Sequence, residues 1–166
     1  DAMGRTPNRE ALIGEGITFG QGVTLLFPIN LSQSPWSFVS AGSVLTSQQL
    51  SFPFSLIRNR APSLEAPQQC EILPGWALAK NTPALARAVH KFAERDRIRG
   101  GDNKPHFLSK ESAEMVLQAL QRLLQVEEIC DFYTDKEISG LGDCVLRESN
   151  RQRAISTYKL FLERYA

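Results

Sequence analysis

The sequence lacks several features that would each point to a class of protein. It has no excess of one charge, because 19 Lys and Arg residues balance 18 Asp and Glu residues, and this argues against a dedicated nucleic-acid-binding protein. No apolar run approaches the roughly 20 residues that a membrane-spanning helix requires, so we expect no membrane partner. The N-terminal residues 1–5 contain no apolar segment and predict no secretory signal peptide.

Cysteine and histidine are also scarce. The three cysteines, Cys70, Cys130 and Cys144, are irregularly spaced and form no C-x-x-C pair, so we predict no metal site. We interpret them as three reduced thiols of a cytoplasmic protein. The two histidines are His90 and His106, and neither lies within residues 11–58.

A six-residue repeat is the most informative feature that is present. The hexads Ile-Gly-Glu-Gly-Ile-Thr and Phe-Gly-Gln-Gly-Val-Thr begin at residues 13 and 19, and Val39 and Leu45 are again six residues apart. This period suits neither a helix nor a simple strand alternation. It is typical of a chain that winds as a parallel β-helix, with one short strand in each hexad and glycines at the tight corners.

The composition divides the chain into three predicted parts. Residues 1–58 are expected to form a short parallel β-helix, residues 59–82 an extended crossing segment with three prolines, and residues 83–166 a helical region. The predicted fold class is therefore α+β, a short parallel β-helix followed by a C-terminal three-helix region. If the hexads are coincidental, residues 11–57 would instead form an antiparallel β-meander.

Two stretches inside the first part do not follow the hexads. Residues 26–37 contain two prolines and interrupt the period, so we interpret them as a loop ejected from the coil that carries Trp36. The apolar run 50–57 contains Pro53, which cannot donate a hydrogen bond to a strand ladder. We interpret this run as an edge strand or as the cap of the coil.

Three helices are predicted in the last part. The first runs from about Pro83 to Arg97, with Thr82 as its N-cap. The second follows Ser109, which is a favourable N-cap before an apolar stripe of helical period. The third begins near Asn150. These helices are expected to cover an open end of the coil or to pack against a neighbouring coil.

The candidate ligand-binding residues are Arg87, Lys91, Arg95 and Trp76. The three basic residues are four positions apart on the first helix, so one face could hold a phosphate through guanidinium contacts. The alternative is a solvated face paired with nearby acidic residues such as Glu94. Trp76 follows a Pro-Gly turn and could stack on a sugar or a base, or it could anchor the packing of two layers.

The hexads resemble the left-handed β-helix (hexapeptide-repeat) superfamily. The order of the later blocks resembles the C-terminal part of an uncharacterised bacterial hexapeptide family; the blocks are residues 52–57, 73–76, 85–87, 91–92, 95–97, 108–109 and 151–158. This resemblance implies that the coil is left-handed, that helices close it, and that three copies assemble around one axis. Members of the family are much longer and carry histidines on their coils, so we expect this chain to be a fragment or a shortened relative.

Two functions remain open on this basis. The first is a non-catalytic assembly or binding module of a hexapeptide-repeat protein, in which the coil drives oligomerisation. The alternative is a transferase that acts on an activated sugar or acyl donor, a chemistry that usually needs a histidine on the coil as general base. We expect a homo-oligomer, with a trimer favoured, and a phosphorylated small molecule as ligand. The sequence identifies no catalytic residue and no cofactor.

Overall fold

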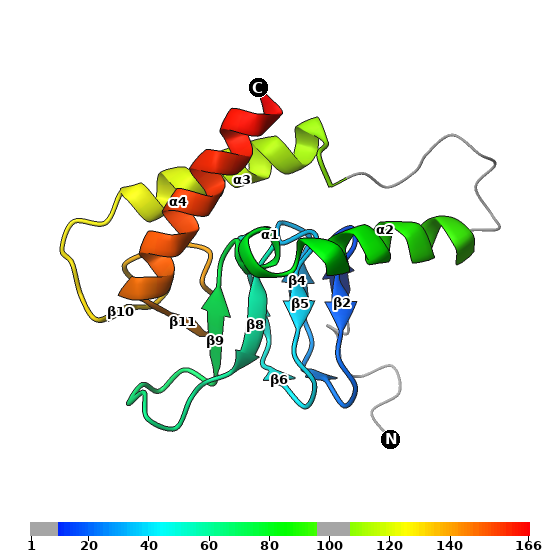
Figure 1. Ribbon diagram of the computed structural model, residues 1–166. Coiled ribbons are helices and arrows are strands. Elements are labelled where there is room, and N and C mark those ends of the chain that lie inside the picture. Colours follow the sequence, from blue (N-terminus) through cyan, green and yellow to red (C-terminus); the bar gives the residue numbers. More distant parts are fainter. Residues whose placement is uncertain (1–9, 96–106) are drawn as a thin grey trace, which may run out of the picture.

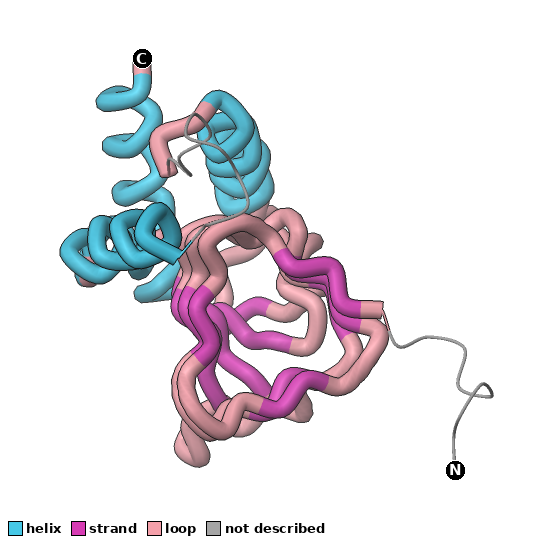
Figure 2. Tube along the Cα trace, turned by 90° about the vertical axis from the view of Figure 1, so that its right-hand side faces the viewer, coloured by secondary structure: helices cyan, strands magenta, loops and turns pink. Residues whose placement is uncertain are grey.

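Residues 11–57 wind through successive turns of a coil with three sides. The computed structural model describes residues 10–95 and 107–166. The strands of the coil are, in order, β1 (Ala11–Ile13), β2 (Thr18–Phe19), β3 (Thr24–Leu25), β4 (Ile29–Leu31), β5 (Phe38–Val39), β6 (Val44–Leu45), β7 (Gln48–Gln49) and β8 (Leu56–Asn59). Strands of consecutive turns pair in parallel as β1-β4-β7, β2-β5-β8 and β3-β6, and Figure 2 shows the resulting three-sided outline. The parallel register rules out the antiparallel meander.

The prediction of an ejected loop at residues 26–37 was wrong. This segment contains β4, which pairs with β1 and β7, and Trp36 is only 1% exposed. The physical reason lies at Gly16, where an added Cβ would come within 2.1 Å of the Trp36 ring. The indole therefore fills the space above a glycine of the preceding turn, and a corner longer than a hexad is needed to place it there.

The run at residues 50–57 belongs to the third turn of the coil. Leu50, Phe52 and Phe54 are fully buried, so this run supplies core side chains. The strand β8 that ends the run is not at an edge, because it pairs with β5 on one side and with β9 (Cys70–Leu73) on the other. The edge-strand interpretation was therefore wrong.

The β2-β5-β8 side of the coil continues into a mixed sheet of six strands. Its order is β10-β11-β9-β8-β5-β2, where β10 is Phe132–Tyr133 and β11 is Cys144–Arg147. β9 is antiparallel to β8 (Figure 1). β11 is parallel to β9. The sequence did not predict β9, which lies in the expected crossing segment, or β10 and β11, which lie in the expected helical region.

The described residues form four helices, α1 (Trp76–Lys80), α2 (Thr82–Arg95), α3 (Lys110–Leu124) and α4 (Glu148–Tyr165). The predicted N-cap of α3 is confirmed, because the Ser109 hydroxyl accepts a hydrogen bond from the Ser112 amide at 3.1 Å. α2 begins at Thr82 itself, and its predicted end at Arg97 lies outside the described residues. The short helix α1 was not predicted.

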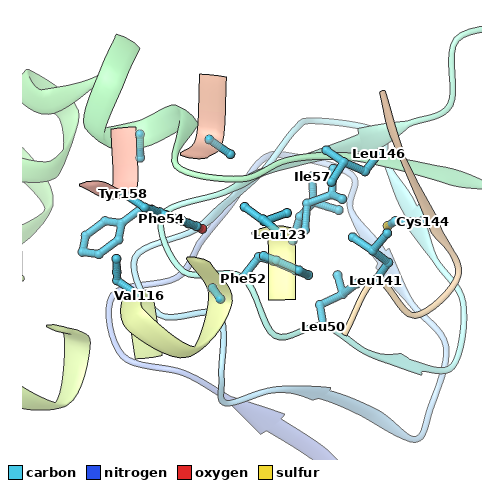
Figure 3. Packing of buried hydrophobic residues seen from close by; sticks show 14 of the residues in the cluster. Leu50, Phe52, Phe54, Ile57, Val116, Leu123, Leu141, Cys144, Leu146 and Tyr158 are labelled. Carbon is cyan, nitrogen blue, oxygen red and sulfur yellow. The ribbon is translucent and has the colours of Figure 1, made fainter. Parts of the chain in front are cut away.

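One hydrophobic core joins the coil to the helices. Phe54 of the third turn, Leu123 of α3 and Tyr158 of α4 belong to the same buried cluster (Figure 3). The Tyr158 hydroxyl donates a hydrogen bond to the Pro53 carbonyl oxygen at 2.6 Å. The last turn of the coil therefore supplies the surface on which α3 and α4 pack.

A buried disulfide fixes the far part of the sheet. Cys70 and Cys144 are directly opposite each other in the parallel pair β9–β11 and are bonded, with their Cα atoms 4.5 Å apart. The prediction of three reduced thiols was therefore wrong for these two residues, whereas Cys130 is free and exposed. The sequence could not show the pairing, because the two cysteines are 74 residues apart and only the sheet topology makes them neighbours.

Candidate functional site

The predicted basic face of α2 is only partly within the described side chains. Arg87 and Lys91 are exposed on this helix, and the side chain of Arg95 lies outside the described residues. His90 Nε2 lies 3.1 Å from a carboxylate oxygen of Glu94, and both side chains are largely exposed. His106 lies outside the described residues. The phosphate-binding role of this face stays a prediction.

Trp76 anchors α1 on the outer side of the coil. Its ring lies 6.1 Å from the ring of Phe38, in an edge-on arrangement at 68°. Val39, the neighbour of Phe38 on β5, faces inward, so Phe38 faces outward. The Trp76 indole therefore covers the outer face of the sheet. This contact supports the packing interpretation of Trp76. The indole nevertheless also lines a groove between α1 and α4.

We call this depression the α1–α4 groove. The groove has an apolar end and a polar end. Four residues line both ends, namely Ala79, Lys80, Arg153 and Thr157. The other lining residues are Leu73, Pro74, Gly75, Trp76 and Asn150 at the apolar end, with Gln152 and Ser156 at the polar end. The two helices approach closely because Gly75, with φ +70°, has no side chain where a Cβ would lie 3.3 Å from Thr157 and Tyr158.

The polar end of the groove is positively charged. Lys80 is in the last turn of α1, Arg153 is in α4, and both side chains are exposed. Within the described part of the chain, neither residue forms an ion pair, and no Asp or Glu lines the groove. Two unpaired cations on opposite walls create a local positive potential on a chain whose net charge is only +1.

A second cluster of charges lies on β9, the strand that also carries Leu73 of the apolar end. Glu71 of β9 has a fully buried side chain and receives hydrogen bonds from Arg58 of β8, at 3.3 Å, and from Arg147 of β11, at 2.9 Å. Glu71 and Leu73 face the same side of β9 because they are two residues apart, but no residue of the cluster lines the groove. One carboxylate between two guanidinium groups leaves a net charge of +1.

A separate network fixes the start of α4, which carries Arg153. Arg151 Nε donates to Glu148 at 2.7 Å, and Arg151 Nη1 donates to the Leu123 carbonyl oxygen at 2.6 Å. The Tyr133 hydroxyl also donates to Glu148, at 2.6 Å. The hydrogen bonds from Arg151 are the main reason why the pKa of Glu148 falls to about 2. This network has a structural role in holding α4 against α3.

The coil carries a group of exposed apolar side chains that we call the apolar corner, namely Leu12, Leu26, Phe27 and Val44. Their exposed fractions are 53%, 47%, 47% and 42%. Leu12 is opposite Asn30, which is flanked by two buried residues, so both face outward on the β1-β4-β7 side. Val44 precedes the buried Leu45 and faces outward on the β3-β6 side. Leu26 and Phe27 connect β3 to β4, where these two sides meet.

Comparison with known proteins adds no relative. No family model, curated protein or solved structure matches this chain. Within residues 10–95 and 107–166, no helix has the length and apolarity needed to cross a membrane. The same residues contain no cluster of three or more His, Cys, Asp or Glu side chains that could hold a metal ion.

Proposed function

We propose that this chain is a non-catalytic assembly and binding module built on a left-handed hexapeptide coil, and that it forms a homotrimer. The six-residue spacing of the inward-facing residues and the positive φ of corner glycines such as Gly16, Gly22 and Gly42 support the hexapeptide assignment. The left hand and the threefold assembly rest on the resemblance to the hexapeptide superfamily.

The apolar corner is the observation that carries the assembly proposal. Four large apolar side chains are each about half exposed on two adjacent sides of a small coil. Figure 2 shows that the described helices gather against another part of the coil and leave these sides uncovered. A group of exposed large apolar side chains on neighbouring sides of a fold is typical of an interaction site. Packing three coils side by side would bury three copies of the corner around one axis.

The alternative function, a transferase that acts on an activated sugar or acyl donor, has less support. Residues 11–58 contain no histidine that could act as general base on the coil. His90 is on α2 beside Glu94, and both residues are open to solvent. For these reasons we propose assembly and ligand binding without catalysis.

Polar substitution of the corner tests the assembly proposal. We expect the double variant Leu12→Asp/Val44→Asp to be a folded monomer by light scattering coupled to size exclusion, because these outward side chains would meet in the trimer. Leu160→Asp is the matched control, since Leu160 on α4 is 47% exposed and lies outside the corner. Wild-type mass in the corner variant, or monomers of the control as well, would contradict the proposal.

We also propose a cytoplasmic location, but the disulfide between Cys70 and Cys144 weakens the argument that the sequence drew from three reduced cysteines. Disulfides persist mainly in oxidising compartments. Cys70 and Cys144 are both fully buried, which limits their contact with soluble reductants and makes this bond compatible with the cytoplasm.

A further inference from the structure

We infer that the α1–α4 groove binds a small phosphate ester, with the phosphate at Lys80 and Arg153 and a planar apolar group against Trp76. The inference rests on the binding part of the proposed function and gives that part a ligand class. It does not require the trimer. It also differs in place from the basic face of α2, because the groove contains none of Arg87, Lys91 and Arg95.

The charge distribution points to an anion. Lys80 and Arg153 approach from two different helices, and neither has an ion-pair partner among the described residues. A dianionic phosphate would relieve the repulsion between these two cations and accept charge-assisted hydrogen bonds from both. The polar side chains of Ser156 and Thr157 line the same end and add hydrogen-bonding groups.

The other end of the groove favours a planar apolar group. Leu73, Pro74 and Trp76 form this end, and the contact with Phe38 already fixes the indole in place. A ligand therefore does not have to order the aromatic side chain, which lowers the entropic cost of binding. The polar and apolar ends share lining residues, so a single small molecule can reach both.

The binding preference can be measured with three simple probes. We would titrate the full chain with phenyl phosphate, inorganic phosphate and phenol by isothermal calorimetry. The inference predicts that phenyl phosphate binds best, about tenfold tighter than inorganic phosphate. A tenfold gain in affinity is what the burial of a small apolar group is expected to contribute. Equal affinity for the two phosphates would overturn the ligand class, and the absence of binding by all three probes would overturn the site.

Two variants connect the binding to the groove. Lys80→Ala/Arg153→Ala should abolish phenyl phosphate binding, while Lys159→Ala, an exposed cation of α4 that does not line the groove, should retain it. Loss of affinity in both variants, or in neither, would overturn the inference. Oligomeric mass and thermal unfolding are measured on the same samples. If the groove variants keep the wild-type oligomeric mass, a loss of ligand binding is due to the groove and not to a failure of assembly.

Discussion

At the scale of single residues, the buried charges have unequal roles. Glu71 is fully buried, whereas the side chains of Arg58 and Arg147 are 43% and 35% exposed. If the carboxylate is removed, water can still solvate both arginines. If both arginines are removed, a carboxylate stays buried without a counter-charge, which is the more costly arrangement.

This asymmetry gives the first prediction. Arg58→Ala/Arg147→Ala should lower the free energy of unfolding by about 3 kcal/mol or more, because it leaves a buried charge unpaired. Glu71→Gln should cost only about 1 kcal/mol, because the amide can keep part of the hydrogen bonding. Urea denaturation measures both values. A larger loss in Glu71→Gln than in the double variant would show that this account of the cluster is wrong.

Glu148 gives a prediction about pH. Its pKa falls from the ordinary 4.5 in an unpaired side chain to about 2 in the folded protein, chiefly because Arg151 donates hydrogen bonds to it. A depressed pKa stabilises the fold above the unfolded value, and this contribution is lost as the pH falls from 4.5 toward 2. Glu148→Gln should therefore show a weaker decrease in stability over that range. An unchanged pH profile would contradict the role of Glu148.

At the scale of elements, the sequence predicted the features that depend on local patterns, but not the pairings between segments distant in the chain. The hexads predicted parallel turns, and Ser109 with the apolar stripe after it predicted the start of α3. The corner that contains Trp36 was misinterpreted because its length is set by contact with Gly16, in a different turn. β9 and β11 were missed because each is only four residues long and because they pair with each other across 74 residues of sequence.

The groove was only partly predictable for the same reason. The Pro-Gly-Trp turn identified Trp76, because a large aromatic at a turn is a recognisable signal. Lys80 and Arg153 carry no such signal. They are far apart in the sequence, and only the packing of α1 on α4 brings them to one groove.

The coil corners give a matched pair of substitutions. Gly16 and Gly42 have nearly equal φ values, +66° and +71°, but a Cβ at Gly16 would strike the Trp36 ring, whereas nothing lies within 4 Å at Gly42. Gly42→Ala should cost about 1–2 kcal/mol from backbone strain alone. Gly16→Ala should cost about 1–3 kcal/mol more, because it adds a steric clash in a packed site. Thermal or urea unfolding measures the difference, and equal losses would mean that Trp36 does not pack on Gly16.

At the scale of the whole molecule, a few long-range connections join the coil to the rest of the chain. The six-stranded sheet extends one side of the coil, and the disulfide joins β9 to β11 in the part of that sheet that lies beyond the coil. α3 and α4 then pack on the last turn through a continuous core. The stability of the C-terminal part should therefore depend on the disulfide.

Loss of this bond should be measurable. Cys70→Ala/Cys144→Ala is expected to lower the free energy of unfolding by about 2–4 kcal/mol, because the bond reduces the conformational entropy of the unfolded chain. Cys130→Ala is the control, since Cys130 is exposed and free. Alkylation of the denatured wild-type protein should modify one cysteine without reductant and all three with it. Modification of three cysteines without reductant would show that the bond is absent.

The mass of the wild-type protein in solution tests the central claim most directly. The apolar corner is interpreted as a contact between copies, so sedimentation equilibrium over a range of protein concentrations should give three times the chain mass of 18.5 kDa. A mass of 18.5 kDa at every concentration would contradict the assembly role of this coil.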